Sequence, residues 1–281
     1  MKIVLNIIKY ISITVFTCCM IVLILANVVS STILNKQYII GKLEETNYYE
    51  EIKTEIENSF ENYIGQSGLD ENVIKDIVSI DKIKEDTNTI ISNIYDGNSI
   101  SVDTTTIETN LKNNINNSLN GQKLTITQQK AIEEYINKIV EQYKDTMSHT
   151  NYESAIYNYI NKANQSIGQI KKACIIGIAV SVILIFVCNY KTIVKSASSI
   201  GISLASSGIF YIVVNIYIGM KIKVANIAIL NEAISNTLKN IINDVFSNLL
   251  NSGIILFVIG LILVLLGNII FYKNKAKEGK E

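Results

Sequence analysis

The segment NYESAIYNYINKANQSIGQIKKACIIGIAVSVILIFVCNY, residues 151–190, decides the fold of this chain. Its first half is amphipathic, with apolar residues at three- and four-residue steps, and its second half, Ala173–Asn189, carries no charge. No Pro interrupts the segment, so we predict one helix that spans about 60 Å, roughly half of it in lipid. Such a helix would join a helical domain rigidly to a membrane domain.

Four apolar segments are long enough to cross a bilayer, in a chain of 281 residues that is 48% hydrophobic. We predict transmembrane helices at residues 10–30, 173–189, 197–219 and 253–272. The first is expected to stay as an uncleaved anchor, because its apolar run of about twenty residues exceeds that of a signal peptide. Residues 1–9, 190–196 and 273–281 then lie on one side of the membrane, and residues 31–172 and 220–252 on the other.

The charges predict which side is which. The segments 1–9, 190–196 and 273–281 hold eight Lys and two acidic residues, whereas 31–172 holds 21 Asp and Glu against 14 Lys, a net charge of −7. The positive-inside rule places the lysine-rich segments, including both termini, in the cytoplasm. The absence of Arg and the abundance of Lys, Asn and Ile are typical of an AT-rich bacterial genome, so we expect the bacterial cytoplasmic membrane.

Within residues 31–172 the periodicity predicts a series of amphipathic helices. Asn47 and Glu50 have capping-box spacing at the start of the first, which Gly65 is expected to end. A short helix is predicted near 70–78, and another is expected to end at Gly97. The last two are predicted to start at Asp103 and Thr127. The predicted core stripes are Ile52, Ile56, Phe60 and Ile64; Ile83, Ile90, Ile91, Ile94 and Tyr95; Ile107, Leu111, Ile115 and Leu119; and Ile132, Tyr135, Ile136, Ile139 and Tyr143.

Residues 220–252 form a further amphipathic segment before the fourth span. Its stripe consists of Leu230, Ala233, Ile234, Leu238, Ile241, Val245 and Leu249. A helix of this pattern is expected either to pack on the acidic domain or to lie at the membrane surface.

No constellation in the sequence points to catalysis, a cofactor or a metal. The four spans contain no Asp, Glu, Lys or His, which argues against an ion-coupled transporter. His149 is the only histidine, and we expect a solvated loop residue. The pairs Glu44-Glu45, Glu50-Glu51 and Asp70-Glu71 are interpreted as solvated helix faces, with a weak calcium site or a cationic partner as the alternative. We therefore predict no catalytic, cofactor-binding or metal-binding residues.

Small residues and cysteines in the spans are interpreted as packing groups. Small residues recur at four- or seven-residue steps on the second, third and fourth spans, a spacing that suits close helix contacts within the chain or a homo-oligomer. The polar residues near the span ends, Asn27, Asn215 and Asn268, are expected to make interhelical or interfacial contacts. The cysteines Cys18, Cys19, Cys174 and Cys188 are predicted to be free, because their depths in the membrane differ.

The chain resembles two kinds of membrane protein. Its order of elements, with the stretches NYYEEIKTEIENSF (47–60) and ISVDTTTIETNLKNNI (100–115), is similar to that of uncharacterised bacterial four-span integral membrane proteins. It also resembles permease subunits of mechanotransmitting ABC systems, whose second helix extends as a stalk. Those permeases carry a substantial cytoplasmic segment between the second and third spans, where this chain has only NYKTIVKS (189–196).

The sequence therefore predicts an all-α membrane protein with four transmembrane helices and an extracytoplasmic helical domain continuous with the second span. The expected role is non-enzymatic: sensing, scaffolding or binding of a protein partner through the acidic domain. A permease-like subunit is the alternative. Nucleic-acid binding has no support, because no basic and aromatic patch is present.

Overall fold

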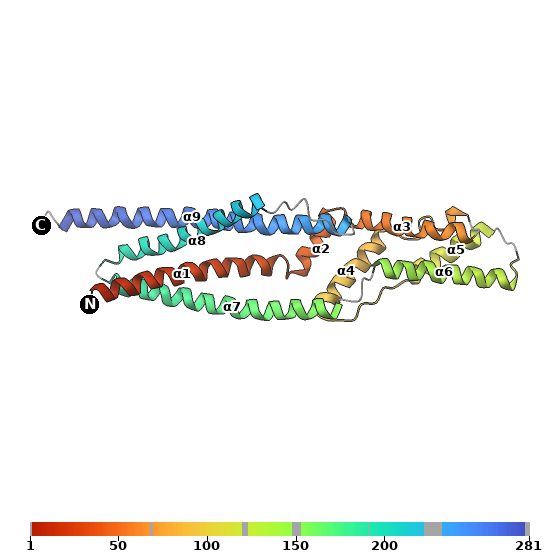
Figure 1. Cartoon of the computed structure of the whole chain (residues 1–281), viewed down its shortest axis with the longest axis horizontal. Coiled ribbons are helices and arrows are strands. Elements are labelled where there is room, and N and C mark those ends of the chain that lie inside the picture. The colour runs from red at the N-terminus through yellow and green to blue at the C-terminus, as the bar shows by residue number, and fades with distance from the viewer. Residues whose placement is uncertain are drawn as a thin grey trace. The chain divides into compact units, whose positions relative to one another are not determined.

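A computed structural model describes residues 2–67, 70–119, 123–147, 153–190, 192–221 and 232–278. These residues are almost entirely helical, and no strand occurs among them (Figure 1). The elements in chain order are α1 (Lys2–Ser31), α2 (Lys36–Glu45), α3 (Tyr48–Ser67), the 3₁₀ turn η1 (Glu71–Val73), α4 (Ile80–Asp96), α5 (Thr105–Leu119), α6 (Ile126–Met147), α7 (Glu153–Cys188), α8 (Val194–Lys221) and α9 (Glu232–Glu278).

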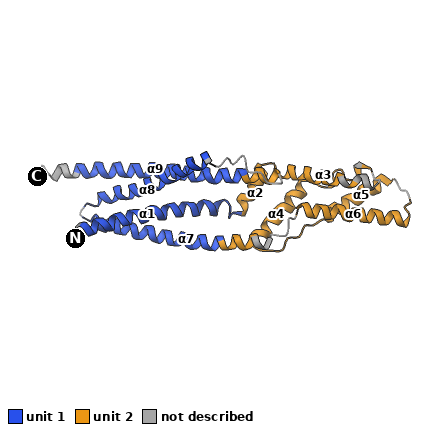
Figure 2. Ribbon diagram, in the orientation of Figure 1, with its two compact units in different colours: residues 1–35, 163–227, 239–281 blue, residues 36–162, 228–238 orange. Residues whose placement is uncertain are grey.

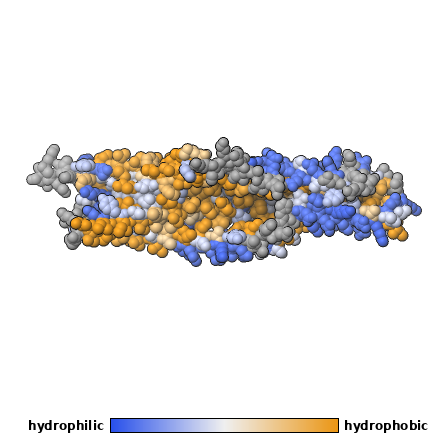
Figure 3. Space-filling view, in the orientation of Figure 1, coloured by the Kyte–Doolittle hydropathy of each residue, from blue (hydrophilic) through white to orange (hydrophobic). Residues whose placement is uncertain are grey.

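The chain divides into two compact units (Figure 2). Unit 1 comprises residues 1–35, 163–227 and 239–281, and unit 2 comprises residues 36–162 and 228–238. On the face drawn in Figure 3, apolar side chains cover most of unit 1, whereas hydrophilic side chains gather on unit 2. This contrast is the one expected between a membrane unit and a water-exposed unit.

Four helices are long and apolar enough to cross a membrane. They cover Ile3–Ser31, Ile156–Cys188, Val194–Met220 and Glu232–Lys273. The predicted single helix over 151–190 is confirmed for its described residues, since α7 runs without a break from Glu153 to Cys188. Its first two predicted residues lie outside the described part of the chain.

The predicted amphipathic segment 220–252 and the fourth span are not separate elements. Helix α8 extends to Lys221, and α9 runs continuously from Glu232 to Glu278. Residues 222–231 lie outside the described part of the chain. Ala233 is buried in the core of unit 2, and Leu249 packs with Val28 and Tyr211 in unit 1. Ala233 thus packs on the acidic helical unit, which was one of the two expected environments, whereas Leu249 packs against α1 and α8.

Unit 2 has its own hydrophobic core, built from the stripes that the periodicity predicted. The fully or nearly fully buried side chains include Ile52, Ile56 and Phe60 from α3, Ile83 from α4, Ile107, Leu111 and Ile115 from α5, and Tyr135, Ile136, Ile139 and Tyr143 from α6. Each buried side chain of this size contributes about 1.5–3 kcal/mol relative to an exposed one. The core therefore accounts for a stable helical unit without any disulfide.

Several predicted helix boundaries are wrong. Asn47 directly precedes α3, and its carbonyl oxygen accepts the N–H of Glu51 at 3.2 Å, but its φ of 53° is left-handed, whereas an N-cap residue is normally extended. Helix α3 continues through Gly65 to Ser67, since one glycine costs only about 1 kcal/mol inside a helix. The helix predicted near 70–78 is reduced to the single turn η1.

Other boundaries are set by local hydrogen bonds. Gly97 ends α4 as predicted, with a φ of 76°. Asp103 accepts the backbone N–H of Thr105, the first residue of α5, at 3.0 Å, in agreement with its predicted role. Helix α6 begins two residues earlier than predicted, because Thr125 and not Thr127 caps it. The Thr125 hydroxyl accepts the N–H of Gln128 at 3.3 Å, and the Gln128 side chain accepts the N–H of Thr125 at 2.9 Å.

Unit 1 is held together by close contacts between α8 and α9. A Cβ added to Gly260 would lie 2.4 Å from the backbone nitrogen of Ala205 and 2.6 Å from the carbonyl oxygen of Gly201. The same closeness recurs about two turns away along α9 on either side, where Gly253 meets Gly208 and Gly267 meets Ser198. The small-residue faces of the third and fourth spans therefore pack against each other within the chain.

A ladder of hydroxyl groups joins α8 to α1. The Ser203 hydroxyl lies 3.3 Å from the carbonyl oxygen of Ile13, and the Ser207 hydroxyl lies 3.3 Å from that of Thr17. One turn further, the Tyr211 hydroxyl donates to the carbonyl oxygen of Ile21. The serine hydroxyls share their protons with carbonyl oxygens of α8 itself, at 3.3 Å from Ser203 to Ser199 and 2.9 Å from Ser207 to Ser203, so Tyr211 makes the one hydrogen bond of this ladder that is directed to α1 alone.

Candidate functional site

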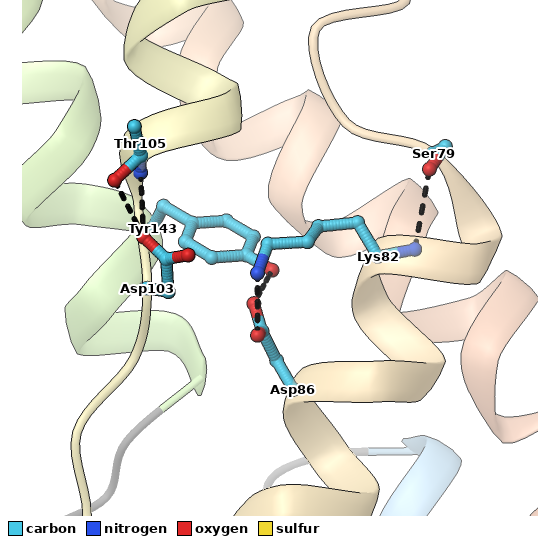
Figure 4. Close-up of polar contacts among 6 residues, drawn as sticks. All are labelled: Ser79, Lys82, Asp86, Asp103, Thr105 and Tyr143. Carbon is cyan, nitrogen blue, oxygen red and sulfur yellow. Dashed lines mark hydrogen bonds and ion pairs between the residues drawn. The ribbon is translucent and has the colours of Figure 1, made fainter.

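A polar cluster lies in the core of unit 2, between α4 and α6. Lys82 and Asp86 are one turn apart on α4, which begins after the N-cap residue Ser79, and Tyr143 comes from α6 (Figure 4). The Lys82 ammonium lies 2.8 Å from Asp86 Oδ1, and the Tyr143 hydroxyl donates to Asp86 Oδ2 at 2.7 Å. Lys82 is 9% exposed, Asp86 5% and Tyr143 0%.

The electrostatics of the cluster favour one protonation state. Burial raises the pKa of the Tyr143 phenol, and the hydrogen bond to Asp86 and the negative charges of Asp86 and Glu85 raise it further. Tyr143 therefore remains a neutral donor, while the Asp86 carboxylate is balanced by the Lys82 ammonium. Both carboxylate oxygens have a partner, so the cluster is suited to hold α4 on α6 rather than to attack a substrate.

A neighbouring carboxylate is held at the start of α5. Asp103 Oδ1 accepts the Thr105 hydroxyl at 2.7 Å in addition to the Thr105 N–H (Figure 4). These two hydrogen bonds lower the pKa of Asp103, because they stabilise its charged form. Asp103 is thereby a helix-starting group and not a candidate acid or base at neutral pH.

The surface of unit 2 carries a groove between α5 and α6, which we call the α5–α6 groove. It has a volume of 380 Å³, within the range of ligand-binding pockets. Its lining residues are Glu108, Lys112, Ile115 and Asn116 from α5 and Gln129, Ile132, Glu133, Ile136 and Asn137 from α6. Ile115 and Ile136 are buried and form an apolar floor, while exposed charged and amide groups form the rim. This combination suits an amphipathic segment with apolar anchors.

The predicted acidic pairs do not gather at one place. Glu44 forms an ion pair with Lys84, and Glu45 forms one with Lys42. Glu51 accepts a 3.4 Å hydrogen bond from Asn236, while Glu50 is exposed. Asp70 accepts the N–H of Asn72 at 2.8 Å, as in a turn. In the described ranges, no three His, Cys, Asp or Glu side chains form a group that could hold a metal ion.

His149 and the side chain of Glu71 lie outside the described residues, so their expected surroundings stay predictions.

Two of the three amides near the span ends, those of Asn215 and Asn268, make hydrogen bonds between helices. Asn215 donates to the carbonyl oxygen of Phe246 at 2.7 Å, and Asn268 accepts the Ser198 hydroxyl at 3.5 Å. Asn27 lines a recess at the end of α1.

The four cysteines are free, as predicted. The prediction that the cysteines lie at different depths in the membrane is wrong for Cys19 and Cys174. The Cys19 thiol on α1 lies against α7, since a Cβ added to Gly177 would lie 2.7 Å from its sulfur, and it interacts with Cys174 one turn away. Both helices extend beyond the predicted spans, to Ile3–Ser31 and Ile156–Cys188.

Sequence reasoning missed the buried cluster and the hydroxyl ladder. The four-residue spacing of Lys82 and Asp86 was a visible signal for their ion pair, but it does not distinguish a buried pair from an exposed one. Nothing local to Asp86 identifies Tyr143, which is 57 residues away, as its partner. Comparison with protein-family models, with curated proteins and with solved structures found no match.

Proposed function

We propose that this chain is a multi-pass membrane protein whose unit 2 binds a protein partner, without catalysis, in the α5–α6 groove. The observation that carries the proposal is the groove itself, in which the partly exposed Ile132 lies over the buried Ile115 and Ile136, under a rim of charges and amides. Burial of apolar anchors in such a groove supplies affinity, and the rim supplies orientation. A sensor or a scaffold at the cell surface would use the same kind of contact.

The partner that suits this groove is a basic amphipathic segment. Unit 2 holds 22 Asp and Glu against 12 Lys, a net charge of −10. On the rim, Lys112 is already paired with Glu108, whereas no ion pair neutralises Glu133 among the described residues. A Lys or Arg of the partner would face Glu133, while an acidic segment would be repelled by the unit as a whole.

The location of the groove is part of the proposal. Lysines near the ends of the spans, at Lys2, Lys9, Lys195 and Lys273, support a cytoplasmic position for both termini and for the α7–α8 link. With four crossings, unit 2 would then face the outside of a bacterial cytoplasmic membrane. A partner would be a protein of the cell surface or envelope.

The test is purification of the tagged chain from its native membranes in a mild detergent, with identification of the co-purifying proteins. Glu133→Lys should weaken recovery of the partner by about tenfold or more, because like charges across an interface repel. Glu134→Lys is the matched control, since Glu134 is exposed on the same helix but does not line the groove. Equal recovery by wild type and both variants would exclude the groove as the binding site.

The permease-like alternative is distinguished by the same experiment. The continuous helix α7 favours it, because a stalk that leads into a span is a feature of those permeases. The link between α7 and α8, residues 189–193, is short for docking an ATPase. A stoichiometric ATPase among the co-purifying proteins would support this alternative. Since the glycine faces of α8 and α9 are covered within the chain, a homo-oligomer would need other surfaces.

A further inference from the structure

A polar recess opens in unit 1 where α1, α7 and α9 meet, and we call it the α1–α7–α9 recess. Its volume is 490 Å³, and it is lined by Asn27, Val28, Ser30 and Ser31 of α1, Lys171 of α7, and Asn248, Asn251, Ser252 and Ile255 of α9. Each of the three helices thus contributes polar residues to one place. It is separate from the α5–α6 groove, and the following proposal does not depend on partner binding there.

The lining is rich in hydrogen-bond donors and contains one charge. Lys171 is the only charged residue in the recess, and no ion pair involves it among the described residues. Three carboxamides and the hydroxyls of Ser30 and Ser252 supply further donors, while the third lining serine, Ser31, donates to the Val28 carbonyl oxygen. No carboxylate lines the recess, so an anion would meet no like charge there.

One carbonyl group at the C-terminal end of α1 is occupied by donors of the chain. Exposed carbonyl groups at a helix C-terminus normally repel negative charge. The carbonyl oxygen of Val28, a lining residue, accepts the hydroxyls of Ser31 and Thr32 at 3.1 and 2.6 Å and the N–H of Thr32 at 3.0 Å. These donors reduce the repulsion that this carbonyl would exert on an anion.

The recess also lies at the boundary between polar and apolar surface. The apolar span predicted within α9 begins at Gly253, next to Ser252, and the uncharged stretch of α7 begins at Ala173, two residues after Lys171. Ile255 lines the recess yet is 59% exposed, so it offers apolar surface on its open side. A ligand that fits both features has an anionic head and an apolar tail.

We propose that the α1–α7–α9 recess binds the headgroup of an anionic phospholipid, with the phosphodiester held by Lys171 and the neighbouring amides. A charge-assisted hydrogen bond from the ammonium to a phosphate oxygen is short and strong, and the amides of Asn248 and Asn251 add neutral ones. The acyl chains extend along Ile255 into the surrounding lipid. The site would thereby select lipids by charge.

The experiment uses the full chain, purified in mild detergent and incubated with phosphatidylglycerol or phosphatidylcholine, with bound lipid counted by native mass spectrometry. Wild type should retain phosphatidylglycerol in preference to phosphatidylcholine. Lys171→Gln should weaken retention of phosphatidylglycerol about tenfold. Lys172→Gln should bind as wild type does, because Lys172 is the adjacent exposed lysine and does not line the recess.

A second variant keeps the proposal testable if Lys171→Gln does not fold. Asn251→Asp keeps the shape of an exposed side chain and adds a negative charge to the recess, so it should also lose the preference for phosphatidylglycerol. Equal losses in the Lys171 and Lys172 variants, equal binding of the two lipids, or displacement of lipid by millimolar inorganic phosphate would each overturn the proposal. The last outcome would indicate a site for free phosphate.

Discussion

The Tyr143 hydroxyl donates a hydrogen bond of 2.7 Å to Oδ2 of Asp86, whose other oxygen lies 2.8 Å from the Lys82 ammonium. The three side chains come from two helices and are buried, so they form a closed polar network inside an apolar core. A network of this kind stabilises the fold only while every member keeps its partner. Its energetic role can therefore be measured by removing one member at a time.

Replacing Tyr143 by Phe should destabilise unit 2 by about 1.5–3 kcal/mol, because a buried carboxylate oxygen then loses its donor. Asp86→Ala should cost more, about 3–5 kcal/mol, since it leaves the buried Lys82 ammonium without a counter-charge. Hydrogen exchange of α4 and α6 amides in the full chain measures the loss.

An exposed pair serves as the matched control for these variants. Lys112 and Glu108 have the same one-turn spacing on α5, but both side chains are about half exposed. Lys112→Met should therefore change the protection of α5 by no more than about 0.5 kcal/mol. Equal effects of Lys112→Met and Asp86→Ala would contradict the assigned role of the buried cluster.

Unit 2 should lose stability at alkaline pH. Burial, followed by the charge of Glu55 and the neighbouring Tyr49, raises the pKa of Tyr48 to about 12, and burial raises that of Tyr143 in the same direction. In the unfolded chain these phenols ionise near pH 10, so above that pH the unfolded state releases protons that the folded state retains. Stability is thus complete below about pH 10 and falls as the pH rises further.

The loss of stability at alkaline pH can be followed by the helicity of the chain and by tyrosinate absorbance. Tyr143→Phe and Tyr48→Phe should each reduce the slope of stability against pH above about 10, even where they lower stability at neutral pH. Ionisation of every tyrosine near pH 10 with helicity unchanged would show that these phenols are not protected by the fold.

Gly260→Ala should separate α8 from α9. The added Cβ would lie 2.4 Å from a backbone nitrogen of α8, which cannot rotate away as a flexible side chain can. Overpacking of this kind costs about 1–3 kcal/mol. Gly219→Ala is the control, because nothing lies within 4 Å of a Cβ at Gly219. Thermal unfolding in detergent should show a lower midpoint for the first variant only; unchanged midpoints for both would argue against the close α8–α9 contact.

Mild oxidation should join Cys19 to Cys174. The two free thiols lie close together where α1 approaches α7, so a copper–phenanthroline oxidant, which accepts their electrons, should link them within one chain. Peptide mapping without reductant would detect the bridge. Cys18→Ser should keep it and Cys19→Ser should abolish it. A bridge that instead involves Cys18 or Cys188 would show that α1 and α7 pack in another register.

Much of the fold could be predicted because apolar periodicity is a strong local signal. It identified the four spans and the core stripes, including Ile56 on α3 and Ile139 on α6, which are both 0% exposed. Helix ends were less predictable, because their signals are weak and compete. Thr125 and Thr127 both have the chemistry of an N-cap, and Gln128, three residues after Thr125, was the clue that favoured the former.

The partners of side chains could not be predicted to the same extent. The seven-residue spacing of Gly253, Gly260 and Gly267 indicated a packing face, but it did not identify α8 as the helix that covers it. Ser203 and Ser207 differ little from their apolar neighbours in a hydropathy pattern, so the ladder to α1 was not visible. The α1–α7–α9 recess collects residues from three distant segments, and only their assembly reveals its donor-rich lining.

The most direct test of the account is to determine on which side of the membrane α5 and the α7–α8 link lie. Single cysteines are placed at Asn117, exposed on α5, and at Ile193, 63% exposed in the α7–α8 link, in a chain whose four native cysteines are replaced by Ser. A membrane-impermeant maleimide is then applied to intact cells. The account predicts labelling at position 117 in intact cells and at position 193 only after permeabilisation. Labelling of both positions, or of position 193 alone, in intact cells would contradict it.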